Sequence, residues 1–99
     1  MALTIEQALQ QGVAAHNAGN LKEAERIYRA VLQTQPEQPS ANHNLGLIAI
    51  SANQIEAALS LFKTALNVNS IVEQFWISYI DALVRAQRPI DAKQAIKKA

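Results

Sequence analysis

Side chains capable of acid–base, nucleophilic or metal chemistry are few in this sequence. Its two histidines, His16 and His43, are accompanied by no cysteine, and two imidazoles alone do not complete a zinc site. Ser40 stands one helical turn before His43, but no acid is placed to orient the imidazole, so a hydrolytic triad has no support. Glycine-rich phosphate loops and zinc-protease motifs are also absent from the sequence. We therefore expect no enzymatic activity, no metal site and no cofactor.

The composition favours a folded domain that binds neither nucleic acid nor membranes. Hydrophobic residues make up 49% of the 99 residues, and the net charge of +1 offers no polycationic surface for phosphates. The two most apolar stretches, 38–55 and 71–84, are interrupted by amides or carboxylates and fall short of the ~20 apolar residues that span a bilayer. The N-terminus shows no secretory signal, so a cytoplasmic location is expected.

A pattern of small and large residues recurs along the chain every thirty-four residues. At this spacing Gly46 falls on Gly12, and Phe62 falls on Tyr28. The alanine pattern continues in both directions, through Ala24, Ala58 and Ala92. A fixed period of this length indicates stacked supersecondary units. A glycine opposite an aromatic ring is what two closely packed helices require, so each unit is expected to be a helix pair.

These residues resemble the tetratricopeptide repeat (TPR) family, whose helix–turn–helix unit has the same period and the same Gly, Ala and aromatic positions. The resemblance implies an all-α superhelical solenoid with six antiparallel helices. Its three repeats would cover residues 5–38, 39–72 and 73–99 of a single domain. In the third repeat Ile80 stands at the Gly position, so we expect its two helices to pack less closely.

Local signals place the helix boundaries. The capping box, a hydroxyl residue followed three positions later by Glu or Gln, begins a helix and occurs as Thr4 with Gln7 and as Ser70 with Glu73. Asn20 is expected to cap the second helix, and Pro39 suits the first turn of the third. The expected helices cover about 5–18, 21–33, 39–52, 55–68 and 90–99, and a fifth helix opens at the Ser70–Glu73 capping box and runs to about 86.

In the TPR family the first helices of successive repeats line a concave groove that binds peptides. Carried over position by position, the resemblance places a mixture of aliphatic, amide and charged side chains there. Such a surface suits an extended or helical peptide, because aliphatic groups supply burial and amides bond the peptide backbone. The predicted groove residues are Leu9, Val13, His16, Asn17, His43, Asn44, Leu47, Ser51, Ile77, Ser78, Asp81 and Arg85.

Asn44 is the best single candidate for contacting a peptide, since its amide offers both a donor and an acceptor. The alternative is that Asn44 satisfies neighbouring groups of its own helix pair, and the sequence leaves the two readings open. The TPR subclass that holds chaperone tails needs cations for the peptide carboxylate. The matching positions here carry no cation, so chaperone-tail binding is not expected: they are Leu9, Val13, Asn44, Gln74 and Ser78.

The resulting hypothesis is a non-catalytic module that binds a protein or peptide. One alternative is the N-terminal recognition or scaffolding region of a larger enzyme, because the run from Ala18 through Tyr28 resembles bacterial TPR regions that precede glycosyltransferase or sulfotransferase domains. A second alternative is self-association. The expected last helix carries an apolar stripe including Ile96 with no following polar helix to cover it. The chain is thus expected to be part of a longer one, or to form a homo-oligomer through this helix.

Overall fold

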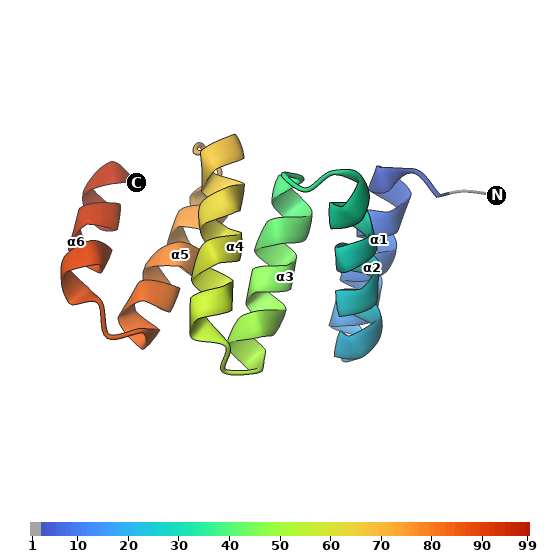
Figure 1. Ribbon diagram of the computed structural model, residues 1–99, viewed down its shortest axis with the longest axis horizontal. Coiled ribbons are helices and arrows are strands. Elements are labelled where there is room, and N and C mark those ends of the chain that lie inside the picture. The colour runs from blue at the N-terminus through green and yellow to red at the C-terminus, as the bar shows by residue number, and fades with distance from the viewer. Residues whose placement is uncertain (1–2) are drawn as a thin grey trace.

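The computed structural model describes residues 3–99 and consists of six α-helices joined by short turns. The helices stand side by side in chain order along an elongated molecule of 47 × 25 × 19 Å (Figure 1). This arrangement confirms the all-α helical-repeat fold. The helices are α1 (Ile5–Asn17), α2 (Leu21–Thr34), α3 (Pro39–Ser51), α4 (Ile55–Val68), α5 (Glu73–Arg85) and α6 (Pro89–Lys98).

Side-chain caps fix the starts of three of the six helices, α1, α2 and α3. The Thr4 side chain accepts a hydrogen bond from the Gln7 backbone N–H at 3.0 Å, and the Gln7 side chain accepts one from the Thr4 N–H at 3.0 Å. The capping box predicted for α1 is therefore confirmed. The Asn20 side chain accepts from the N–H of Glu23 at 3.4 Å, as expected for α2. Each bond satisfies a backbone donor that the first helical turn leaves free.

The prediction that Ser70 caps α5 is wrong. The N-cap of α5 is Val72, and no side chain bonds the first turn. The Ser70 backbone carbonyl instead accepts a hydrogen bond from the indole Nε1 of Trp76 at 2.7 Å. The Phe75 N–H is already paired with the Val72 carbonyl at 3.1 Å. The turn before α5 is thus tied to the helix by the Trp76 indole and not by a capping hydroxyl.

The thirty-four-residue period also appears in the backbone. Between the helices of each pair one residue adopts a positive φ: Gly19 at 80°, Asn53 at 59° and Gln87 at 59°. This left-handed conformation ends many helices and is least costly for glycine. Glycine occupies it only in the first repeat, so the turn geometry is set by the stacking of the repeats and not by residue type alone.

Glycine and an aromatic ring interlock in the first two helix pairs. A Cβ atom at Gly46 would lie 2.4 Å from Cε1 of Phe62, and one at Gly12 would lie 2.6 Å from Cε1 of Tyr28. Both rings are fully buried. The third pair lacks this arrangement, and α5 and α6 touch each other less extensively than α3 and α4. The looser third pair predicted from Ile80 is confirmed.

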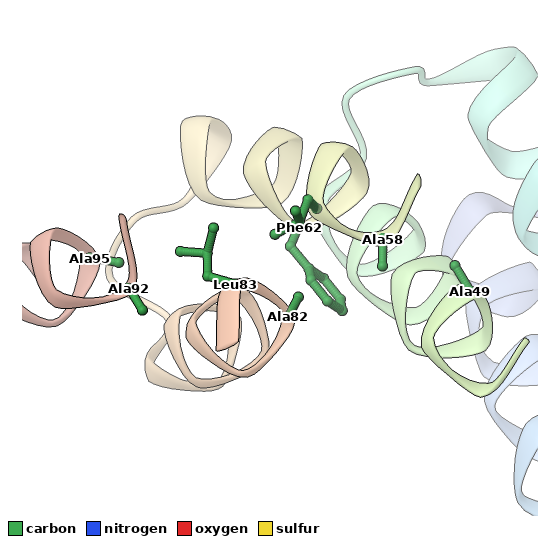
Figure 2. Packing of buried hydrophobic residues seen from close by; sticks show 8 residues of the cluster. Ala49, Ala58, Phe62, Ala82, Leu83, Ala92 and Ala95 are labelled. Atoms are coloured by element: carbon green, nitrogen blue, oxygen red, sulfur yellow. The ribbon is translucent and has the colours of Figure 1, made fainter. Parts of the chain in front are cut away.

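Apolar clusters at the junctions hold successive repeats together. The largest joins α3 and α4 to α5 and α6; in Figure 2, Phe62 points from α4 toward the space between α3 and α5, and Ala92 and Ala95 lie on the side of α6 that faces α5. A second cluster joins α1 and α2 to α3. Each repeat thus buries its apolar face on the next. Across residues 3–99, no helix has the length and hydropathy needed to cross a bilayer.

Candidate functional site

The surface formed by α1, α3 and α5, here called the first-helix face, carries the predicted groove residues. Between α3 and α5 it is hollowed by a depression of about 280 Å³. This volume is at the lower end of the range of small-molecule pockets, so it suits one or two side chains of a larger partner. Its lining residues are Leu47 and Ile50 of α3, Phe62 of α4, and Gln74, Ile77, Ser78 and Asp81 of α5.

His43 lies inside the junction of the second and third repeats and contacts Ser78, one of the residues that line the hollow. Its Nε2 lies 2.8 Å from Oγ of Ser78, and its ring is tilted against Phe75 and Phe62 at centroid distances of 4.8 and 5.5 Å. His43 and Ser78 are each only 6% exposed. The family resemblance placed both on the groove surface, whereas the structure buries them because this side of α3 packs on the following repeat.

The hydrogen bonds of His43 determine how its ring is protonated. Nδ1 lies 3.3 Å from the side-chain oxygen of Asn44, which can only accept. A proton on Nδ1 satisfies that oxygen and leaves Nε2 to accept from the hydroxyl of Ser78. Burial lowers the pKa of His43 below its ordinary value, and the hydrogen bond with Asn44 partly opposes this shift. The neutral ring therefore fits the site best.

Asn44 lies between this histidine and a second buried polar group, the hydroxyl of Tyr28. That hydroxyl is buried and makes no hydrogen bond of good geometry within the part of the chain that the structure describes. Burial raises the pKa of Tyr28, and the nearby amide of Asn44 partly offsets the rise. The Asn44 side chain is half-buried, so one edge of its amide faces the helix pair while part of it remains open to solvent.

The other predicted residues fall into two groups. Leu47, Ile77 and Asp81 meet at the hollow, and Ile77 is 50% exposed. Outside the hollow, Arg85 forms an exposed ion pair with Asp81 at 2.8 Å, and the Ser51 hydroxyl donates to its own helix. The residues of α1 lie apart from it on the same face, with Val13 and Asn17 exposed and Leu9 and His16 partly buried. Of the twelve predicted residues, the hollow therefore brings together four: Leu47, Ile77, Ser78 and Asp81.

Two features of the face were absent from the predicted set. Phe62 lies beneath the hollow although it belongs to a second helix, and its match with Tyr28 was the signal for its buried position. His43 and Asn44 were in the predicted set, but the contact between them and the position of Asn44 near the Tyr28 hydroxyl were not predicted, because helical periodicity does not show which side chains meet across a junction. Within residues 3–99 no three His, Asp or Glu side chains are grouped closely enough to hold a metal ion.

Comparison with known proteins identifies the class. The family model described as tetratricopeptide repeat matches residues 15–70, which is more than half of the chain. The chain belongs to the tetratricopeptide repeat family, whose members generally mediate protein–protein interactions.

Among solved structures, a mutant of MamA is similar to this chain, with a TM-score of 0.84 and 21% sequence identity. The match covers 98% of this chain and 56% of that one, so the chain spans just over half the length of that structure. At this identity the likeness concerns the fold. A search of curated proteins finds no match.

Proposed function

We propose that the domain is a non-catalytic module that binds an extended or helical segment of a partner protein on its first-helix face. The hollow between α3 and α5 carries this proposal, because it places the aliphatic side chains of Leu47 and Ile77 beside the exposed amide of Gln74. Leu47 and Ile77 supply apolar surface for a partner side chain. Gln74 in the hollow and Asn44 elsewhere on the first-helix face supply donors and acceptors for a peptide backbone, which is the combination that peptide grooves use.

The polar residues of the hollow favour a peptide over a small apolar ligand. Asp81 is paired with Arg85 on the same helix and is about half-exposed, so neither charge is buried. An approaching peptide can therefore exchange water-mediated contacts with this pair at little desolvation cost. The buried hydrogen bond between His43 and Ser78 holds α3 and α5 at a fixed spacing, which keeps the hollow preformed.

Peptides selected from a random display library provide the probe for this face. Each selected peptide would be made synthetically and measured by fluorescence anisotropy against the purified domain. We expect Leu47→Glu and Asn44→Lys to weaken binding at least tenfold while the far-ultraviolet circular dichroism stays unchanged. Val68→Glu, an apolar-to-acid change at an exposed position of α4, is the matched control and should leave binding intact. Selected peptides that bind both groove variants as tightly as the unchanged domain would refute the assignment.

Asn44→Ala distinguishes the two readings of Asn44. If the amide contacts the peptide, this variant loses affinity while its midpoint of urea unfolding changes little. If the amide mainly satisfies His43 and the region of Tyr28, the midpoint falls and the affinity of the folded protein is retained. The 3.3 Å contact between Asn44 and His43 supports the structural role of the amide. The half-exposed position of Asn44 supports its contact with a peptide.

Self-association is a second candidate, supported by apolar side chains at the C-terminal edge of the fold. Val84, Ile90 and Ile96 are 60%, 72% and 59% exposed. Pairing of this edge with a second copy would remove these side chains from water. The mass measured by light scattering should then rise with concentration, and Ile96→Glu should give a monomer at every concentration. A monomer for the unchanged chain would exclude this route. The transferase context inferred from sequence stays a prediction, with no structural observation to favour it.

A further inference from the structure

A second groove lies on the opposite set of helices, between α4 and α6, with α5 beneath it. It has a volume of about 280 Å³. The two flanking helices both run from the lower to the upper end of the molecule in Figure 1, so the groove follows their axes. Its lining residues are Lys63, Leu66 and Asn67 of α4, Trp76 and Tyr79 of α5, and Arg88, Asp91, Gln94, Ala95 and Lys98 of α6 or its N-cap.

The equivalent groove between α2 and α4 provides an internal comparison. Arg29 stands there at the position of Lys63, and its Nε is paired with Glu25 Oε2 at 2.8 Å. One repeat later the position of Glu25 is taken by Leu59, which is buried. Lys63 therefore has no carboxylate one turn before it. The cation in the groove between α2 and α4 is thus neutralised by an ion pair, whereas Lys63 in the groove between α4 and α6 is not.

The two grooves also differ in volume. Leu61 of α4 packs against the apolar clusters of both junctions, and the depression that it lines between α2 and α4 has a volume of only about 180 Å³. The equivalent residue of α6 is Ala95, whose short side chain is buried against α5. Trp76 and Tyr79 of α5 consequently line the groove. The Trp76 ring is fixed by its hydrogen bond to the Ser70 carbonyl.

Three cationic side chains, Lys63, Arg88 and Lys98, line this groove. Arg88 lies at the start of α6 and is paired with Asp91 at 2.8 Å, and Glu56 also acts on it electrostatically. Lys63 and Lys98 remain, and among the residues from 3 to 99 no carboxylate lies within ion-pair distance of either. Asn67 and Gln94 add amide groups beside them.

We propose that the groove between α4 and α6 binds an acidic peptide segment, separately from the ligand of the first-helix face. Lys63 and Lys98 would meet its carboxylates, and the rings of Trp76 and Tyr79 would cover an apolar side chain between them. From Arg88 to Lys98 the helix rises about 15 Å, which matches four or five residues of extended chain at about 3.3 Å each. Two free cations suit such a segment, whereas a nucleic acid requires a longer track of phosphate contacts.

Trp76 is the single tryptophan of the chain and reports directly on the groove. The probe is a short synthetic peptide in which glutamates flank a central leucine pair, and its counterpart carries lysine in place of each glutamate. We expect the acidic peptide to change the Trp76 fluorescence saturably and the lysine peptide to leave it unchanged. Raising the salt concentration should weaken the binding, because the lysines that carry it are exposed.

Charge reversal within and outside the groove provides the decisive comparison. The double variant Lys63→Glu, Lys98→Glu should bind the acidic peptide at least tenfold more weakly. Lys93→Glu, Lys97→Glu makes the same change of net charge on the exposed side of α6, outside the groove, and should weaken binding less than threefold. Equal losses in the two double variants would overturn the proposal, as would an absence of saturable binding.

A short single-stranded RNA of similar charge provides the remaining test. Binding of this RNA as tight as that of the acidic peptide, with the same dependence on Lys63 and Lys98, would mean a general polyanion surface and would also overturn the proposal. Because Leu47→Glu alters only the first-helix face, it should leave the Trp76 response intact. The experiments can therefore refute either of the two proposed binding sites without refuting the other.

Discussion

The central helix pair, α3 with α4, and the last pair, α5 with α6, occupy the same register of the repeat but pack by different means. In the central pair Gly46 admits the ring of Phe62, which is fully buried. In the last pair the equivalent residues are Ile80 and Ile96, and Ile96 is 59% exposed. The helices of the last pair contact each other through Ala92 and Ala95 of α6, which pack with Leu83 of α5 (Figure 2).

This difference shows that one repeat period accommodates two kinds of helix contact. The glycine–aromatic contact fixes the separation of α3 and α4 closely, because neither the backbone nor a buried ring can move far. The alanine contact leaves the outer side of α6 free for polar side chains and opens the groove beside α4. The central pair accordingly contributes more to the stability of the fold. The last pair tolerates substitutions better, and its side chains line the groove beside α4.

The largest expected effect is the loss of the Phe62 ring. Phe62→Ala should cost about 3–5 kcal/mol of unfolding free energy, as for other buried aromatic truncations. Ile96→Ala, at the equivalent position of the last pair, should change it by no more than about 0.5 kcal/mol because the side chain is largely in water. Urea unfolding followed by circular dichroism measures both. Similar losses in the two variants would show that the pairs do not differ as described.

A methyl group at Gly46 tests the closeness of the central pair. Gly46→Ala places a Cβ atom 2.4 Å from the Phe62 ring and should cost about 1–3 kcal/mol by overpacking. It should do so although alanine favours a helix by roughly 1 kcal/mol over glycine. Phe62→Leu in the same chain should relieve part of the loss, since the leucine does not reach as far. A net gain in stability from Gly46→Ala alone would mean that the helices separate freely.

Protonation of His43 should weaken the junction between the central and last pairs. Its pKa in the folded state lies below the unfolded value of about 6.5 because burial disfavours the charged ring. The folded state then binds fewer protons, so the stability contributed by His43 is full above pH 6.5 and falls as the pH drops below it. The loss is at most about 1.4 kcal/mol per pH unit.

Urea unfolding at a series of pH values between 7 and 5 would measure this loss. His43→Gln removes the titrating ring and should flatten the profile in this window, although the variant starts from a lower stability at pH 7. His16→Gln, a change of the partly buried histidine of α1, should keep the slope of the unchanged protein. The same slope in all three proteins would contradict a role for His43.

Sequence patterns predicted the fold because its determinants are local or periodic. The helix ends were placed within about one residue at Thr4, Asn20 and Pro39, where a side chain or ring acts on its own first turn. The capping box at Ser70 does not form, and the Ser70 carbonyl instead accepts a hydrogen bond from the indole of Trp76, six residues further along. Contacts of this kind depend on how the chain turns back, which the local pattern does not contain.

The candidate sites were predicted less completely for a related reason. Periodicity placed Leu47, Ile77 and Asp81 on one face, and the hollow unites them. It did not show that the neighbouring repeats bury His43 against Ser78. The groove between α4 and α6 was missed because a net charge of +1 averages over the chain. The sequence does indicate this groove when equivalent residues of successive repeats are compared: Leu59 stands in place of Glu25, and Ala95 stands in place of Leu61.

The smallest predicted effect is also the most direct test of the two packing modes. Ile80→Gly with Ile96→Phe gives the last pair the residues of the central pair. Ile80→Gly alone should destabilise the fold, and Ile96→Phe alone should have little effect. Together they should recover part of the loss, with a coupling energy near the lower end of the roughly 0.5–3 kcal/mol found for contacting residues.

A complete double-mutant cycle in urea measures this coupling, with Ile90→Phe as a control because Ile90 is also exposed on α6 but does not match the position of Phe62. Ile90→Phe should be additive with Ile80→Gly. Additivity of Ile96→Phe as well would mean that Ala92 and Ala95 against Leu83 alone set the approach of α6. Favourable coupling would instead mean that the residue at position 80 decides between the two modes, because only a glycine there leaves room for an aromatic ring from the partner helix.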